Sequence, residues 1–290
     1  MKDAWLDGWR EVGIAVQEIH TDFAESAQGV ATDGTRWFVV SNRAVAGLMR
    51  KITAPASVFG RYRNTRRVGV FGPDGRKIRE VAPDAGIWAE LVGRNRAVAK
   101  ERPIHLGAPA WVRDTLLVPT QKPSGIWVLA DDLAHQDWWP DPAPERPERY
   151  SWVDLEPGSG LLYTTLHWRP GRLQALEWQT LARVSDADVV LGPSDPALDR
   201  VQGGAFLDGR ILLTSSAGRG RLYTYRLSDG RWLGVRQFGD YVEMEGITVH
   251  RRPVGGQEAD VHILDAGTHY WPVVKWGDNF SIRSYTTPAH

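Results

Sequence analysis

The chain alternates short apolar runs with polar turns, and one such pattern recurs five times along its 290 residues. Each copy starts with a polar residue, usually followed by a glycine and then by about four mostly apolar residues. A turn follows, and then a second apolar run that ends in polar residues. The copies begin at Gln28, His105, Ser151, Gln202 and Glu245. Aromatic and β-branched runs separated by Asp-Gly or Gly-rich turns predict β-hairpins.

Each copy is followed by two more predicted strands, as in RLYTYRLSDGRWLGVRQF after the fourth copy. Four strands in each repeat of about 45 residues are typical of β-propeller blades. The first interval is longer because residues 43–66 and 83–103 are inserted. We therefore predict an all-β, five-bladed β-propeller with four-stranded blades, forming a single domain over residues 1–290. No long amphipathic helix is expected.

The ring must be closed to avoid a free sheet edge. The segment VGIAVQEI, residues 12–19, is predicted to complete the last blade as its outer strand, with a simple N-terminal arm as the alternative. Over residues 12–285 the pattern resembles the five-bladed β-propeller superfold. That superfold includes tachylectin-like lectins, arabinanase-type glycosidases and calcium-activated apyrases. This resemblance implies a fold and leaves the function open.

The composition limits the possible partners. Lys plus Arg equals Asp plus Glu at 35 each, so no overall charge attracts nucleic acid or an acidic membrane. The absence of cysteine excludes disulfides and thiolate metal ligands. The N-terminus shows no apolar leader, and no apolar run reaches the roughly 18 residues of a membrane span. We expect a cytoplasmic monomer with a small-molecule substrate and with no nucleic-acid or membrane partner.

In a propeller, the start of the first strand and the end of the second strand of each blade lie at the same mouth of the channel. This geometry collects a polar set and leaves mostly turn residues, such as Asp33-Gly34 and Asp208-Gly209, for the other mouth. The predicted set is Gln28, Ser41, Asn42, His105, Gln121, Lys122, Ser151, His167, Gln202, Ser215, Ser216, Glu245, Asp265 and His269. We expect the functional site at this mouth.

Glu245 is the candidate centre of the site. A carboxylate at the channel axis must be paired, protonated or bound to a cation. Three interpretations stay open: a ligand of one divalent cation (Ca²⁺ or Mg²⁺), which is the single cofactor we consider; a structural partner of Gln28 and Gln202 in a water-filled channel; or a general acid or base. Glu243, two residues earlier, is a possible second carboxylate.

Histidines form a second candidate cluster at this mouth, where His105, His167 and His269 are predicted catalytic residues. One of them could act with Asp22, Glu245 or Asp265 as an acid or base, and four imidazoles including His20 could instead bind a transition metal. His262 lies within an apolar strand pattern and is expected to be a core residue.

Residues 34–73 contain no Asp or Glu but eight Lys or Arg residues. Most belong to the 43–66 insertion, which should leave the first blade at the functional mouth. We predict a basic flap in which Arg43, Arg61 and Arg63 hold a phosphate, diphosphate or carboxylate. A solvated loop that pairs with acids elsewhere is the alternative.

These observations favour an enzyme of the hydrolase or lyase/isomerase class that acts on an anionic small molecule by hydrolysis, elimination, isomerisation or cyclisation. Gln28, Gln202, Trp168 and Tyr270 would line its substrate site. The alternatives are a non-catalytic propeller that binds a small ligand or carbohydrate, and a protein-interaction scaffold. Nucleophile-elbow, Walker, dinucleotide-binding and HExxH motifs are absent.

Overall fold

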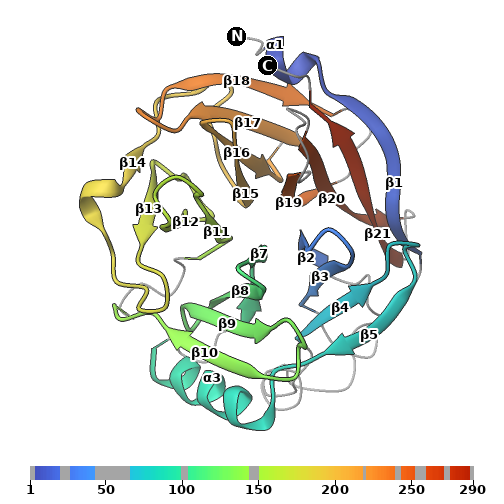
Figure 1. Ribbon diagram of the computed structural model, residues 1–290, viewed down its shortest axis with the longest axis vertical. Coiled ribbons are helices and arrows are strands. Elements are labelled where there is room, and N and C mark those ends of the chain that lie inside the picture. Colours follow the sequence, from blue (N-terminus) through green and yellow to red (C-terminus); the bar gives the residue numbers. More distant parts are fainter. Residues whose placement is uncertain are drawn as a thin grey trace.

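The described part of the chain forms a ring of five antiparallel sheets around a central axis (Figure 1). The structure is a computed structural model that describes residues 4–19, 27–42, 66–98, 104–143, 150–217, 220–238, 243–251, 259–270 and 275–287. Each sheet is one blade, and the blades follow one another around the ring in chain order. The predicted five-bladed propeller with four-stranded blades is confirmed.

The first two blades differ in their inner strands. Blade one runs outward as β2 (Ala27–Thr32), β3 (Trp37–Ser41), β4 (Arg67–Phe71) and β5 (Lys77–Val81). Blade two has β6 (His105–Leu106), β7 (Ala110–Val112), β8 (Thr115–Gln121), β9 (Gly125–Ala130) and β10 (Gln136–Pro140). Its inner strand is split into β6 and β7, which lie on either side of Pro109 and both pair with β8. Proline cannot donate a ladder hydrogen bond there.

The next two blades are regular in strand order. Blade three consists of β11 (Asp154–Leu155), β12 (Leu162–Thr164), β13 (Arg172–Leu176) and β14 (Val189–Val190), with a short helix η1 (Ser185–Ala187) before β14. Blade four consists of β15 (Val201–Leu207), β16 (Arg210–Ser215), β17 (Arg221–Arg226) and β18 (Trp232–Gln237).

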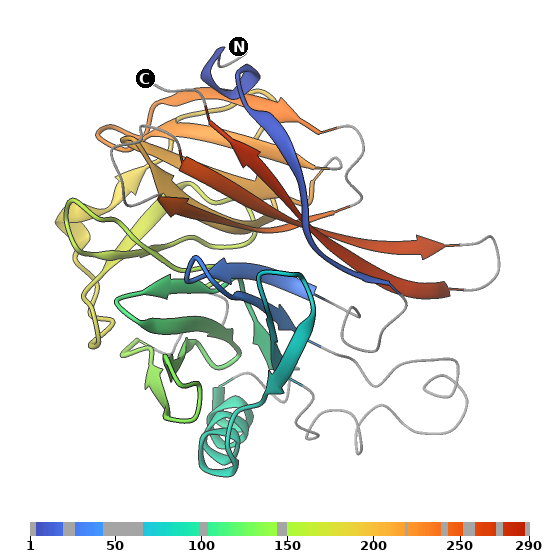
Figure 2. The ribbon, with the colours of Figure 1, turned by 45° about the vertical axis from the view of Figure 1, so that its right-hand side comes forward.

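Blade five joins the two ends of the described chain. It contains β19 (Met244–Arg251), β20 (Ala259–Tyr270) and β21 (Lys275–Thr286), with β1 (Arg10–Ile19) as its outermost strand. The pairing of β1 with β21 runs from Arg10 opposite Thr286 to Ile19 opposite Asn279. The predicted ring closure by the N-terminal strand is therefore confirmed, and Figure 2 shows β1 following β21.

The hydrophobic core is divided into five clusters, each between two neighbouring blades. Phe38 and Trp127 lie in the cluster between blades one and two, and Trp152 and Tyr223 in the cluster between blades three and four. Large rings fill the wedge between adjacent twisted sheets and bury much apolar area. These clusters account for several of the 14 tryptophans.

Two helices cover the ring from outside. The short α1 (Ala4–Asp7) buries Trp5 and Leu6 in the cluster between blades four and five. The 14-residue α3 (Ala85–Val98) lies in the 83–103 insertion, for which no element was predicted from the sequence. Asp84 Oδ1 accepts the Ile87 backbone N–H at 2.8 Å and so starts the helix. Among these described residues, no helix is apolar and long enough to span a membrane.

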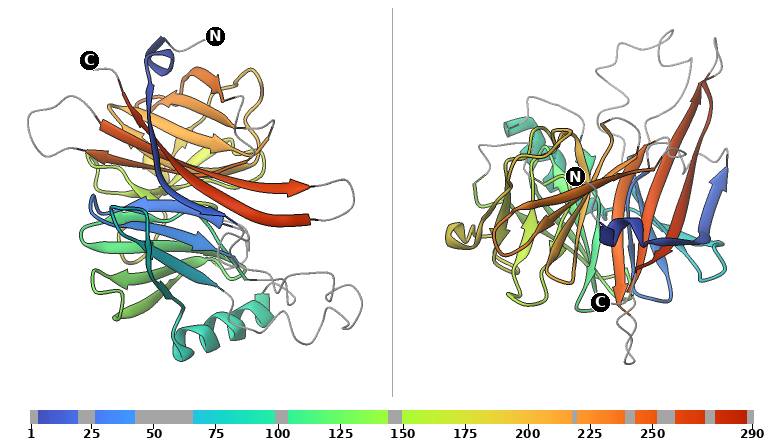
Figure 3. Two further views of the ribbon diagram at one scale, coloured as in Figure 1. Left: turned by 90° about the vertical axis from the view of Figure 1, so that its right-hand side faces the viewer. Right: turned by 90° about the horizontal axis from the view of Figure 1, so that it is seen from above.

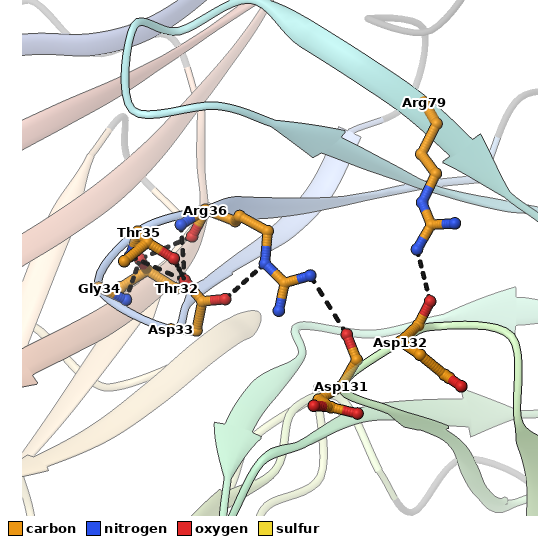
Figure 4. A network of polar contacts seen from close by, with 8 residues as sticks. All are labelled: Thr32, Asp33, Gly34, Thr35, Arg36, Arg79, Asp131 and Asp132. Carbon is orange, nitrogen blue, oxygen red and sulfur yellow. Dashed lines mark hydrogen bonds and ion pairs between the residues drawn. The ribbon is translucent and has the colours of Figure 1, made fainter.

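The face opposite the predicted functional mouth carries polar contacts between blades one and two (Figure 4). Arg36 in the β2–β3 hairpin binds Asp33 Oδ2 at 2.6 Å and donates to the Asp131 carbonyl at 3.2 Å. Arg79 donates to the Asp132 carbonyl at 2.6 Å. The turn residues at this face therefore join neighbouring blades.

Candidate functional site

A β-bulge at the start of three inner strands presents the polar residue of each repeat. The register shifts by one residue between Ala27 and Gly29, between Val201 and Gly203, and between Met244 and Gly246. The extra residues are Gln28, Gln202 and Glu245. A bulge leaves one residue outside the ladder and redirects its side chain. In the first, fourth and fifth repeats the recurrent polar position of the sequence is thus a bulge at the mouth.

Below the bulges the inner strands come into backbone contact. A Cβ on Gly29 would lie 2.3 Å from the Ala108 Cα, and a Cβ on Gly246 would lie 2.8 Å from the Gly29 Cα. The remaining junctions are Gly203 against Gly246, Gly204 against the Trp152 ring, and a parallel bridge from Ala108 to Trp152. The glycine that follows the polar residue therefore allows neighbouring inner strands to approach closely. The central channel is narrow directly behind the mouth.

Glu245 is a buried carboxyl group in this ring, with 3% of its surface exposed. Its Oε1 accepts a hydrogen bond from Gln202 Nε2 at 3.3 Å. Its Oε2 meets no group at hydrogen-bond geometry among the described residues. Burial raises the pKa of Glu245 well above its ordinary value, and the neighbouring Glu243 carboxyl, in looser contact, raises it further. Burial therefore favours the neutral form of the Glu245 carboxyl group.

Glu243 lies directly before β19 and completes a carboxyl pair with Glu245. Its side chain is exposed, whereas its backbone N–H donates to Asp265 Oδ1 at 3.3 Å. Asp265 also lies 3.6 Å from the Arg283 guanidinium. Asp265 therefore binds the backbone of Glu243 and the Arg283 guanidinium. It supports the Glu243–Glu245 carboxyl pair and does not act as a third free carboxylate.

His105 lies deep in the same mouth. Its Nε2 is 3.4 Å from Asn42 Nδ2. Burial, together with the nearby charges of Arg66, Lys122 and His167, lowers the pKa of His105 to about 3. The imidazole is therefore neutral at ordinary pH and can exchange hydrogen bonds with a ligand.

The two cations that act on His105 come from blades one and two. Arg66 is 9% exposed, donates from Nε to the Ile104 carbonyl at 2.6 Å, and has its pKa lowered to about 10 by burial. Lys122 ends the β8 segment, and its carbonyl accepts Asn95 Nδ2 from α3. The mouth is therefore bipolar, with a carboxyl pair in blade five and cations in blades one and two.

Several predicted mouth residues join neighbouring blades. Asn42 binds both the N–H and the carbonyl of Leu106 at 2.7 Å. Gln121 donates to the Tyr150 carbonyl at 3.3 Å. His167 Nδ1 lies 3.0 Å from the Val201 carbonyl, which accepts, so Nδ1 carries a proton. The end of each of these second strands therefore fastens the start of the next blade.

The remaining predicted site residues separate into two groups. Trp168 is 53% exposed and packs edge-to-face on His167 at 5.0 Å, which places it at the mouth. His269 and Tyr270 belong to the projecting end of β20 beyond Asp265 (Figure 3), and their side chains lie outside the description. Arg43, Arg61 and Arg63 lie outside the described residues, as does most of the predicted flap.

Metal binding at the mouth stays a prediction. No group of three or more His, Cys, Asp or Glu side chains within the described ranges is placed to hold a metal ion.

His262 lies in the core, as predicted. It is 6% exposed, binds Ser284 Oγ at 2.8 Å and contacts the Trp37 ring at 4.5 Å. Burial lowers its pKa to about 4, so its assignment to the core is confirmed.

Solved structures share this fold, although no protein-family model and no curated protein match the sequence. Glutaminyl cyclase of Myxococcus xanthus aligns with a TM-score of 0.56 and 11% identity over 96% of this chain and 99% of that chain. A bifunctional GH43-CE protein of Bacteroides eggerthii aligns with 0.54 and 8% over 90% and 35%. The Malassezia sympodialis allergen Mala s 1 aligns with 0.50 and 12% over 94% and 78%. At these identities the likeness concerns the fold alone.

Proposed function

We propose that the protein is an enzyme that binds an anionic small molecule at the channel mouth and transfers protons to and from it through Glu245. One observation carries this proposal: Glu245 is a buried carboxyl group, redirected by a bulge, with one oxygen that makes no hydrogen bond of normal geometry among the described residues. A carboxyl group with a raised pKa can donate a proton near neutral pH.

The carboxyl pair suggests how the proton cycle closes. Glu245 donates its proton to the leaving group of the substrate while the Glu243 carboxylate accepts the proton of the attacking group. The new bond to carbon forms as the bond to the leaving group breaks. The proton then passes from Glu243 to Glu245, which restores both groups without an outside reagent. Contact between the two carboxyls supports this return step.

The cations in blades one and two would orient the substrate. Arg66 and Lys122 lie near enough to lower the pKa of His105, so an anionic group beside His105 would be attracted to them. His105, neutral by burial, would offer a hydrogen bond without adding charge. A substrate with an anionic group beside His105 would present its reacting group to Glu245.

Cyclisation or elimination fits this arrangement best, because both need one proton removed and one delivered within a single molecule. The glutaminyl cyclase that shares the fold over nearly all of both chains has cyclisation in its name. Hydrolysis would use the same acid with water as the attacking group. A divalent cation at Glu245 is a rival centre, since it would require the ionised carboxylate that burial disfavours.

The test compares the wild type with Glu245→Gln. Both are incubated with a panel of small carboxylates and phosphates and with glutaminyl peptides, and products are identified by mass spectrometry. We expect wild-type conversion with loss of water or ammonia, a fall in kcat of about 100-fold or more in Glu245→Gln, and a wild-type rate that declines as Glu245 ionises at higher pH. Full activity of Glu245→Gln would overturn the proposal, and so would a stoichiometric metal ion that is lost with Glu245.

A binding protein without catalysis is the second candidate, and the exposed Trp168 favours it. It predicts a ligand that is bound unchanged and equally well by Glu245→Gln. Isothermal titration of any ligand found in the panel separates the two candidates.

A further inference from the structure

A cavity of ≈ 420 Å³ lies between blades three and four. Part of its lining belongs to the segment that joins β14 to β15, which Figure 1 shows. Leu191, Leu198 and Pro170 form apolar walls, and Ser194, Tyr225 and Asp199 add polar groups. Burial raises the pKa of Tyr225 to about 12, so its hydroxyl stays protonated. The volume and the mixed walls match those of small-molecule pockets.

Two chain segments connect this cavity with the channel mouth. In the first, His167 lies near His105, Trp168 is exposed, and Arg169 lines the cavity. In the second, Asp199 lines the cavity and Gln202 binds Glu245. Three peptide units separate Asp199 from Gln202, so their Cα atoms are at most about 11 Å apart.

The surface between the cavity and the mouth carries an aromatic ring and two positive charges. The Arg200 guanidinium lies 5.1 Å from the centre of the Trp168 ring. Arg169 lines the cavity, and among the described residues neither arginine has an ion-pair partner. The nearby Asp199 uses Oδ1 to accept the Arg169 backbone N–H at 3.0 Å. Two guanidinium groups lie near a single carboxylate, which already accepts a backbone hydrogen bond. The surplus positive charge favours binding of an anion here.

We propose that this cavity is the distal subsite of the channel-mouth site, and that it selects an elongated substrate that carries a carboxylate or phosphate group between its apolar body and its reacting end. The body occupies the cavity, Trp168 contacts it, and Arg169 and Arg200 hold the anionic group. The reacting end extends along residues 199–202 toward Glu245. The substrate assignment rests on the proposed function, whereas the cavity as a binding site does not.

Fragment binding tests the cavity independently of catalysis. The probes are 4-phenylbutyrate, which has an apolar ring and a carboxylate, and 4-phenylbutanol, which has the same body without charge. Ligand-observed NMR and calorimetry give affinities for the wild type, Arg200→Gln and Ala197→Trp, in which an exposed lining residue is enlarged to fill the cavity. Arg113→Gln is the matched control, because Arg113 lies 5.3 Å from the Trp178 ring in a turn at the other face.

We expect 4-phenylbutyrate to bind the wild type about fivefold more tightly than 4-phenylbutanol, and to bind Arg200→Gln and Ala197→Trp about fivefold less tightly. Arg113→Gln and Glu245→Gln should bind it as the wild type does. Equal affinity for acid and alcohol, or unchanged affinity in Ala197→Trp, would overturn the subsite. Loss of fragment binding in Glu245→Gln would place the fragment at the mouth and also overturn it.

The two proposals fail in different ways. If the fragments bind as expected while Glu245→Gln keeps full turnover, the cavity is a binding site and the proposed chemistry is wrong. If Glu245→Gln abolishes turnover while Ala197→Trp binds the fragments normally, the chemistry stands and the distal subsite is wrong.

Discussion

The side-chain amide of Gln202 links Glu245 of blade five to Ser216 of blade four. Its Nε2 donates to Glu245 Oε1 at 3.3 Å and to Ser216 Oγ at 3.2 Å, so both amide hydrogens are used. The amide is therefore fixed with its nitrogen toward the carboxyl group. Two bulge residues on neighbouring blades, Gln202 and Glu245, thus position the acid at the mouth.

Removing this amide should make Glu245 harder to ionise. In Gln202→Leu the carboxylate loses a donor that favours its charged form, so the pKa of Glu245 should rise further. Infrared difference spectroscopy can follow the protonated-carboxyl band of Glu245, identified by its absence in Glu245→Gln. A band that disappears at lower pH in Gln202→Leu than in the wild type would contradict this prediction.

The raised pKa of Glu245 predicts a pH-dependent stability. The folded-state pKa lies above the unfolded value of 4.5, so the unfolded chain releases this proton first as pH rises. Glu245 therefore lowers wild-type stability from about pH 4.5 upward, until the folded carboxyl also ionises. Glu245→Gln lacks this loss, and its excess Tm over the wild type should grow over that range. A constant difference in Tm from pH 4 to pH 8 would show that the carboxyl group is not perturbed.

His105 should remain neutral across the physiological range. Its folded-state pKa of about 3 lies below the unfolded value of 6.5, so it destabilises the fold increasingly as pH falls from 6.5 toward 3. NMR should find the His105 ring protons unshifted between pH 8 and pH 5, with His105→Gln for assignment. The buried His262, with a pKa of about 4, should behave in the same way. A His105 midpoint near pH 6.5 would argue for an open, hydrated mouth.

The contact between inner strands predicts opposite effects for two glycine substitutions. In Gly29→Ala the new methyl group would lie 2.3 Å from the Ala108 Cα, and we expect a loss of about 1–3 kcal/mol in the free energy of unfolding. Gly93→Ala in α3 meets nothing within 4 Å and should gain about 0.5–1 kcal/mol. Urea denaturation measures both. Equal changes in the free energy of unfolding for the two variants would show that the inner strands can move apart at the channel axis.

Asn42 should matter for stability more than its place at the mouth suggests. Asn42→Ala removes both hydrogen bonds to the Leu106 backbone and should cost about 1–3 kcal/mol of unfolding free energy. Asn42→Asp restores the acceptor but sets an oxygen against the Leu106 carbonyl, so it should not recover the loss. Recovery in Asn42→Asp would show that only the acceptor contributes.

The fold could be predicted because its signals are local. Turn residues, strand periodicity and the repeated polar-Gly position lie within each repeat, and the alternation of strands places Gln28, Gln202 and Glu245 at one mouth. The helix α3 could not be predicted, because its large apolar residues are confined mostly to residues 87–92, between Gly86 and Gly93, and do not repeat along the helix.

The roles of individual mouth residues depend on contacts with neighbouring blades. A sequence pattern within one repeat cannot show such contacts. Asn42 and Gln121 read as ligand groups in the sequence, yet each binds the backbone at the start of the next blade. The influence of Arg66 on His105 joins residues far apart in the chain. The cavity beside Arg169 arises from the packing of two blades and has no signature in either repeat.

The closure of blade five by β1 has a consequence for the order of folding. Residues 10–19 precede every other described strand of the ring but pair with residues 279–286, so this strand stays unpaired until the rest of the ring has been made. Its pairing spans more of the sequence than that of any other described strand and carries the largest loop-closure entropy among them. Blades one to four can therefore form during synthesis, whereas the ring locks only when the last strand has emerged.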